Sequence, residues 1–126
     1  MRDLVSNIAV VPAIAPAVQA AAADGAAIDL KGFNRVAFVI TTGAVVGAGD
    51  FGVKVQESDD GVAFTDAAGS AVQGAVPATL AAASAYKLGY VGFKRYARLS
   101  LTKAGGTSLA LGAVAIKADP ASAPVA

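Results

Sequence analysis

The sequence contains no cysteine, no histidine and no tryptophan. Without cysteine the chain has no disulfides, no thiolate nucleophiles and no zinc–thiolate sites. Without histidine it lacks the most frequent general base and the most frequent neutral metal ligand. Charged residues are also scarce, at 15% against about 25% in an ordinary soluble domain. These absences argue against an enzyme and favour a structural or binding role.

Small apolar side chains are abundant, since 56% of the residues are hydrophobic and about a quarter are alanine. A chain of 126 residues is expected to form one domain with a high ratio of surface to volume, so it cannot bury this much apolar surface alone. Part of that surface is therefore expected to face another protein.

The charge pattern gives no sign of a nucleic-acid partner, because the net charge is +1 and the cations are scattered. The densest cluster is Lys94, Arg95 and Arg98. Three such residues are typical of the solvated end of a strand, whereas a phosphate-binding patch needs more cations on one face.

Residues 4–23 form an uncharged stretch, which raises the question of a signal peptide or a membrane span. Ser6 and Asn7 interrupt its apolar run, and Pro12 and Pro16 split it. Neither a cleavable signal nor a spanning helix fits this pattern, so we expect no membrane association.

Three regions follow one another along the chain. Residues 1–16 are predicted to form an extended N-terminal arm, because two prolines forbid a continuous helix. Residues 17–117 form the body, and residues 118–126 are a Pro- and Ala-rich tail. The arm's apolar and proline residues are expected to form an interface with a neighbouring protein: Leu4, Val5, Ile8, Val10, Val11, Pro12, Ile14 and Pro16.

The body shows the period-two alternation of β-strands, most clearly at residues 36–41, 51–56, 86–91 and 96–102. Gly-containing turns separate about seven or eight such segments, without crossover helices between them. The prediction is an all-β protein, an antiparallel β-sandwich of jelly-roll-like form. The predicted core residues are Val36, Phe38, Ile40, Val53, Val55, Leu99 and Leu101.

Two predicted strands, 36–40 and 108–116, are apolar on both faces, which is unusual in a two-layer sandwich. One outer face should therefore be covered by the arm, by a neighbouring subunit, or by the uncharged connection at 67–85. Within that connection, the alanines of residues 78–84 would also suit a short helix.

The sharpest local signal is the run Ser58, Asp59, Asp60 and Gly61, which predicts a structural turn. Aspartate accepts backbone hydrogen bonds in tight turns, and glycine supplies the positive φ that closes them. The alternative is a calcium loop with Glu57 and Asp66 as further ligands, but the spacing does not match an EF-hand.

No residue is assigned a catalytic, cofactor-binding or metal-binding role. Carboxylates at a hairpin tip sit in water, whereas acid–base catalysis needs them in a cleft with separated pKa values. The glycines of residues 43–49 lack the order of a phosphate-binding loop. Tyr86, Tyr90, Phe93 and Tyr96 would make a stacking platform for sugars or bases, although aromatics at alternate strand positions more often belong to the core or rim.

Four blocks of the sequence resemble a family of small proteins encoded among the head genes of tailed phages and prophages. These blocks are NIAVVPAIAPAV (7–18), AAIDLKGF (26–33), KVQESDDGVAFTD (54–66) and LGYVGFKRYARLSLT (88–102). Such proteins are similar to head decoration, or cement, proteins, which bind outside the capsid shell and stabilise it.

The resemblance implies a non-enzymatic virion protein without cofactors, made in the bacterial host cytoplasm and located on the capsid surface. Its implied partners are the phage major capsid protein and further copies of the chain, with a trimer favoured. Two other roles stay open: a tail, fibre or head–tail completion protein, and a carbohydrate-binding β-sandwich module.

A second resemblance concerns the fold. Ser-Asp-Asp-Gly-x-x-Phe (58–64) followed by Lys-Arg-Tyr-x-Arg-Leu (94–99) is similar to the pattern of discoidin-type jelly-roll sandwiches. In that family the two segments are structural. The ligand loops of the family have no counterpart here, so glycan binding does not follow from the resemblance.

Overall fold

The computed structural model describes residues 3–120, with side chains described through residue 118. Two short 3-10 helices, η1 (Val5–Asn7) and η2 (Gly69–Ala71), are the helical elements in this part of the chain. The strands are β1 (Ile8–Gln19), β2 (Ala23–Asp24), β3 (Ile28–Asp29), β4 (Phe33–Val46), β5 (Asp50–Ser58), β6 (Thr65–Asp66), β7 (Val72–Gln73), β8 (Ala85–Tyr90), β9 (Tyr96–Gly105) and β10 (Ser108–Pro120).

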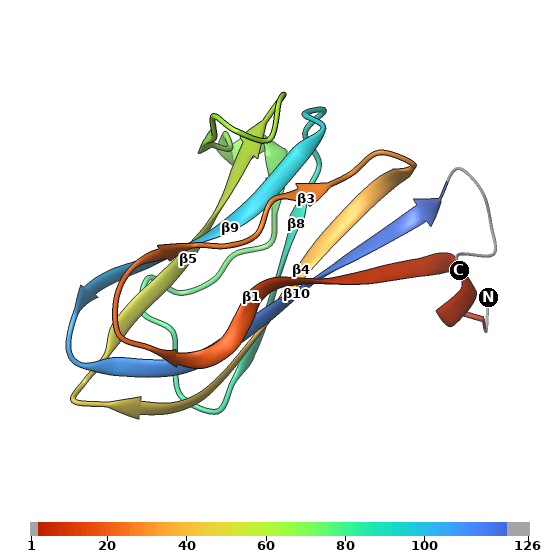
Figure 1. Cartoon of the computed structure of the whole chain (residues 1–126). Coiled ribbons are helices and arrows are strands. Elements are labelled where there is room, and N and C mark those ends of the chain that lie inside the picture. The colour runs from red at the N-terminus through yellow and green to blue at the C-terminus, as the bar shows by residue number, and fades with distance from the viewer. Residues whose placement is uncertain (1–2, 121–126) are drawn as a thin grey trace.

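The strands form two sheets that pack as a sandwich (Figure 1). One sheet has the order β1-β10-β4-β8-β7. The other has the order β2-β9-β5-β6, and β3 also pairs with β9. Every pairing of described strands is antiparallel. The predicted all-β antiparallel sandwich is confirmed. The strand number exceeds seven or eight because four of the strands have two residues each.

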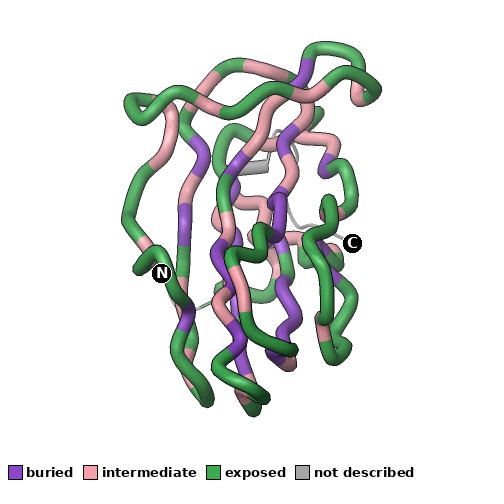
Figure 2. Tube along the Cα trace, turned by 90° about the vertical axis from the view of Figure 1, so that its left-hand side faces the viewer, coloured by how far each residue is buried: buried purple, intermediate pink, exposed green. Residues whose placement is uncertain are grey.

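The core lies between the sheets and follows the alternation of the strands (Figure 2). On β4, Phe38 and Ile40 are fully buried, and Leu99 of β9 lies opposite Val55 of β5 in the register of the second sheet. Six of the seven predicted core residues are buried: Val36, Phe38, Ile40, Val55, Leu99 and Leu101. Val53 is partly buried and packs against this cluster.

The predicted boundary between an arm and a body at residue 16 is wrong. Residues Ile8–Gln19 form one strand, β1, paired with β10 of the same chain. Within it Ala13 and Ile14 are 1% and 8% exposed, so they belong to the core. The prolines keep the chain extended, as expected, but an edge strand tolerates proline because one of its sides needs no N–H donor.

The predicted boundary of the C-terminal tail is also wrong. Strand β10 continues through Pro120, which lies opposite Phe33 of β4. Proline is tolerated at this position because a strand end loses little from one missing ladder hydrogen bond. Residues 121–126, the rest of the predicted tail, lie outside the described residues.

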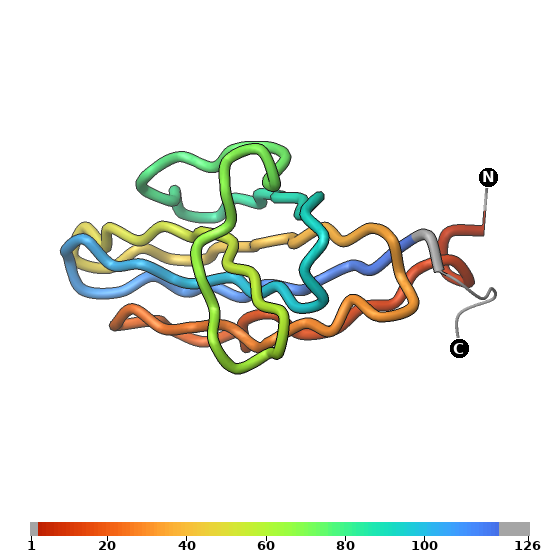
Figure 3. The backbone as a smooth tube through the Cα atoms, turned by 90° about the horizontal axis from the view of Figure 1, so that it is seen from above, coloured from red at the N-terminus to blue at the C-terminus, as the bar shows by residue number. Residues whose placement is uncertain are grey.

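The uncharged connection at 67–85 crosses from one sheet to the other, since β6 and β7 belong to different sheets (Figure 3). Residues 78–84 form bends and a turn, so the short helix considered for them is absent. Their chain is tied to neighbouring strands instead. Leu80 is 1% exposed and its N–H donates to the carbonyl of Phe51, while the Thr42 hydroxyl donates to the Ala81 carbonyl.

One long side of the sandwich is closed by the turn that follows β2. The Ala26 N–H donates to the Ala13 carbonyl of β1 at 2.8 Å, and the Gly25 N–H donates to the Leu99 carbonyl of β9 at 2.7 Å. A Cβ on Gly25 would lie 2.5 Å from the first carbonyl oxygen and 2.7 Å from the second. Only glycine therefore allows β1 to approach β9 this closely.

No helix within residues 3–120 is long and apolar enough to cross a membrane.

Candidate docking surface

The sheet β1-β10-β4-β8-β7 has one side in the core and one side turned outward, which we call the outer face. Its rows follow from the strand register, because residues directly opposite each other point to the same side. Three rows across the sheet are Ile8–Ala118–Arg35, Val10–Ile116–Ala37–Gly89–Gln73 and Pro12–Val114–Val39–Lys87. Two further groups complete the outer face: Pro16, Gly112, Thr41 and Ala85, then Val18, Ala110 and Gly43.

The outer face is apolar and exposed. Val10, Val114 and Val18 are 57%, 37% and 69% exposed, so neither the connection nor residues 3–7 cover them. None of the residues that make up the face is acidic, and its charged members are Arg35 and Lys87. The sequence predicts that the arm, the connection at 67–85 or a neighbouring subunit covers this face. The described residues of the arm and of the connection leave it exposed, so a neighbouring protein is the cover that fits.

The outer face is uneven because alanine and glycine lie beside larger side chains. A groove of about 630 Å³ runs over Ala37 and Gly89, with Ile116, Arg35 and Gln73 among the residues that line it. A second hollow, of about 360 Å³, lies over Gly112 and Gly43. Small side chains of this kind let another backbone or side chain approach closely.

The free edge of β1 is poorly suited to pairing with another strand. Pro12 and Pro16 have no N–H group, and prolines on an edge strand hinder the addition of a further strand. Two bulges, between Pro12 and Ile14 and between Ile14 and Ala17, also interrupt its regular register. Contact with a partner through the outer face is therefore favoured over contact through this edge.

The structure divides the predicted interface residues of the arm into three groups. Ile8, Val10, Pro12 and Pro16 belong to the outer face. Ile14 is a core residue, and Val11 packs against the core. Leu4, which precedes η1, and Val5, which belongs to it, are 58% and 83% exposed.

The predicted turn is built by side chains that bind backbone groups. The Gly61 N–H donates to Ser58 Oγ at 2.9 Å, and the Val62 N–H donates to Asp60 Oδ1 at 2.9 Å. The Val62 N–H, foremost, and the Ala63 N–H both donate to Asp60 Oδ1 and lower the pKa of this carboxyl. Gly61 has φ +76°. The loop is wider than a tight hairpin, because Glu57 pairs with Thr65 across it.

The carboxylates of the turn do not assemble a metal site. Among the described residues, no three Asp or Glu side chains lie close enough together to hold an ion. Asp59 pairs with Lys94 of the loop between β8 and β9 at 2.8 Å, and Asp66 pairs with Lys54 of β5 at 3.1 Å, so the two carboxylates point to different parts of the chain.

The cation cluster at 94–98 is largely neutralised. Arg95 makes two hydrogen bonds to Asp29, at 2.9 and 2.8 Å, and this pairing holds the pKa of Asp29 well below its usual range. Arg98 pairs with Asp24 at 3.3 Å. Because each of these cations pairs with its own carboxylate, the cluster links strands and loops of the fold to one another.

The four aromatic residues do not form a stacking platform. Tyr90 is 3% exposed and buried in the core, and the Tyr86 hydroxyl accepts the Ala81 N–H. Tyr96 packs against Gly61. Phe93 differs from them, at 99% exposed. Its exposure was not predictable from the residues around it, although its place between a glycine and two cations marks it as a loop residue.

Comparison with known proteins identifies no family. No family model and no curated protein matches the chain. Among solved structures, a chain in the structure of infectious bursal disease virus, Gx strain, has a TM-score of 0.47 and 10% sequence identity over 88% of this chain. The match covers 32% of that viral chain, so the present chain spans about a third of its length.

Proposed function

We propose that the chain is a non-enzymatic structural protein of a virion, a decoration protein that binds the outside of a tailed-phage head and stabilises it. The observation that supports this proposal is the outer face: an exposed, acid-free, apolar surface over several strands. Monomeric proteins rarely expose a continuous apolar surface of more than a few hundred Å². The sequence resembles proteins encoded among phage head genes, and this resemblance implies that the partner is the major capsid protein.

The size of the outer face suggests how the protein would act. Neighbouring strands lie about 4.8 Å apart and alternate residues about 6.8 Å apart, so the face covers roughly 500 Å². Burying it against a partner removes about 1,000 Å² in total, at the low end for specific interfaces. One copy would therefore bind weakly, and a homo-oligomer such as a trimer would gain avidity on a repeating shell.

The described polar side chains fit a structural role. Aspartates at 24, 29, 59 and 66 are paired with cations, and Asp60 binds the backbone of its own loop. Glu57 accepts a hydrogen bond from Tyr90. These carboxylates hold strands and loops together, which leaves them poorly placed for acid–base chemistry.

The proposal is tested by the copy number of the protein in purified virions, measured by quantitative mass spectrometry against the major capsid protein. Decoration requires hundreds of copies, because each binds one of the repeated positions of the shell. About six to twelve copies would instead indicate a connector or tail protein, as expected from the symmetry of such assemblies. Absence from the virion would overturn the proposal.

A carbohydrate-binding module remains the alternative from another class. It needs an aromatic platform, whereas three of the four aromatic residues are engaged in the fold. Binding on a glycan array that is lost in Phe93→Ala, together with absence from virions, would favour this alternative.

A further inference from the structure

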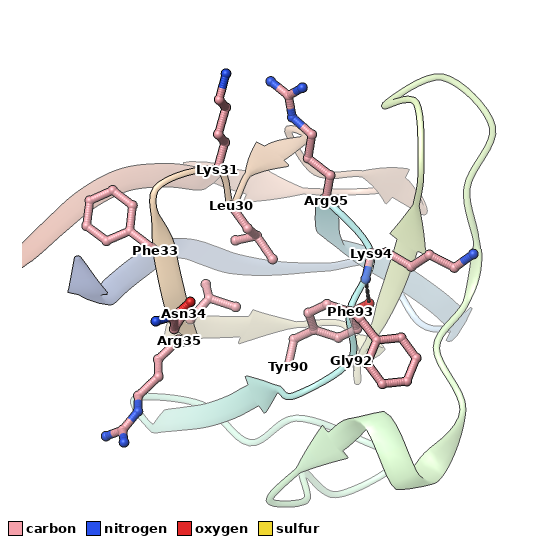
Figure 4. A pocket seen from close by; sticks show the side chains of 11 residues that line it. Leu30, Lys31, Phe33, Asn34, Arg35, Tyr90, Gly92, Phe93, Lys94 and Arg95 are labelled. Atoms are coloured by element: carbon pink, nitrogen blue, oxygen red, sulfur yellow. Dashed lines mark hydrogen bonds between the residues drawn. The ribbon is translucent and has the colours of Figure 1, made fainter. Parts of the chain in front are cut away.

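A second surface lies at one end of the sandwich, where the loop after β3 faces the loop between β8 and β9 (Figure 4). It is a hollow of about 410 Å³. Its apolar lining includes Leu30, which packs against the core, and the buried residues Val36 and Tyr90. The hollow adjoins the groove of the outer face and shares Asn34, Arg35, Val36 and Tyr90 with it, whereas Leu30, Lys31 and the loop residues 92–95 line the hollow alone.

Positive charge surrounds this hollow. Lys31, Arg35, Lys94 and Arg95 line it, and no carboxylate is among its lining residues. Lys94 and Arg95 are paired with carboxylates that lie outside the hollow. Within the described part of the chain, Lys31 and Arg35 form no ion pair, and both are exposed. Figure 4 shows these two side chains on opposite sides of the hollow.

Phe93 is among the residues that line the hollow and is 99% exposed. A whole phenylalanine ring left in water forgoes the hydrophobic stabilisation that its burial would provide. Aromatic residues that insert into a partner's pocket are frequent energetic centres of protein interfaces. A fully exposed Phe93 is therefore a suitable anchor for a partner.

The loop that presents Phe93 is held in place at both ends. The Val91 N–H donates to the Ala71 carbonyl at 2.7 Å, and the Lys94 N–H donates to the Tyr90 hydroxyl at 3.1 Å. The Lys94 ammonium adds its ion pair with Asp59, on the neighbouring loop. Because the backbone is already fixed, binding through Phe93 loses little conformational entropy.

We propose that this end of the sandwich binds a protein segment in which an apolar side chain is flanked by acidic residues. The apolar side chain lies in the hollow against Leu30 and Tyr90, in contact with the Phe93 ring. Carboxylates on either side of it pair with Lys31 and Arg35. This inference goes beyond the proposed function and does not depend on it, because the outer face and the hollow are tested by different residues.

The arrangement favours a peptide segment over other anionic partners. The two unpaired cations flank the hollow on opposite sides, so a segment that crosses it meets one at each end. A lipid surface or a nucleic-acid backbone would need cations directed to one plane or along one track.

The test is a selection from a random library of short displayed peptides, using the full chain as bait. Peptides that bind the variant Phe93→Ala are removed in a counter-selection. The expected result is enrichment of sequences with an aromatic or aliphatic residue between Asp or Glu. For a selected synthetic peptide, Phe93→Ala and Lys31→Gln should each weaken binding about tenfold, which is about 1.4 kcal/mol.

Val62→Ala is the matched control, since Val62 is an 84% exposed apolar residue on the neighbouring loop and does not line the hollow. It should leave the affinity of the peptide unchanged. The proposal is overturned if no peptide discriminates against Phe93→Ala, or if the selected peptides show no acidic enrichment. It is also overturned if phosphatidylserine vesicles or single-stranded DNA bind through Phe93 and peptides do not.

Discussion

The hydroxyl of Tyr90 donates a 2.7 Å hydrogen bond to the carboxylate of Glu57, which joins β8 of one sheet to β5 of the other. The same hydroxyl accepts the Lys94 N–H, where the Phe93 loop returns to the body. One buried phenol thus ties the two layers together and fixes the loop beside the hollow. The hydroxyl of Tyr86, on the same strand, accepts one hydrogen bond, from the Ala81 N–H.

Tyr90→Phe should therefore destabilise the fold more than Tyr86→Phe. Loss of a hydrogen bond to a charged group is expected to cost about 1.5–3 kcal/mol, and loss of a neutral one about 0.5–1.5 kcal/mol. Urea denaturation of both variants measures the difference. An equal or reversed order would contradict the bridging role of Tyr90.

The stability of the protein should fall at high pH through the same residue. Burial and the bond donated to Glu57 raise the pKa of Tyr90 from 10.0 to about 12. Between these values the folded state keeps a proton that the unfolded state has lost, so the free energy of unfolding decreases as pH rises. This part of the pH dependence should be present in Tyr86→Phe and absent in Tyr90→Phe. Parallel pH profiles for wild type and Tyr90→Phe would contradict it.

Gly61→Val should destabilise the protein by about 1–2 kcal/mol or more, because β-branched residues are poor at positive φ. A Cβ at Gly61 would also lie 3.3 Å from the ring of Tyr96. Gly69→Val is the control, since Gly69 has ordinary φ and its Cβ would meet nothing within 4 Å. Chemical denaturation of the two variants compares them, and equal losses would contradict this account of the turn.

Ile14→Ala and Val10→Ala distinguish the two sides of β1. Ile14 is in the core, so its truncation should cost about 2–5 kcal/mol, whereas truncation of the exposed Val10 should cost less than about 1 kcal/mol. Thermal or urea unfolding measures both. A small effect of Ile14→Ala would mean that β1 is the separable arm predicted from the sequence.

The sequence predicts the central strands well, because β4 and β9 are long and their buried residues alternate, as at Phe38 and Leu99. It fails for β1. A segment with two prolines and no polar alternation reads as a loose arm, and only the register with β10 shows it to be an edge strand. The short strands β2 and β3 have no period of their own, since two residues show no alternation.

The sequence predicts that a docking surface exists but not which residues form it. Residues 108–116, apolar on both faces, already predict that the outside of one sheet is covered. Which residues share that face depends on pairings across five strands, such as Val10 with Ile116 and Ala37 with Gly89. The loop that carries Phe93 is likewise held by contacts between residues far apart in the sequence, such as the ion pair of Lys94 with Asp59.

The central claim is that the outer face binds the head shell, and affinity for purified shells lacking the protein tests it most directly. Val10→Asp and Val114→Asp place a charge on the face, and Val62→Asp places the same charge on an exposed loop of the other sheet. Circular dichroism first establishes that all three variants fold. In cosedimentation, the two face variants should bind at least about tenfold more weakly than wild type, with Val62→Asp unchanged. Folded face variants that bind with wild-type affinity, or an equal loss in Val62→Asp, would contradict the account.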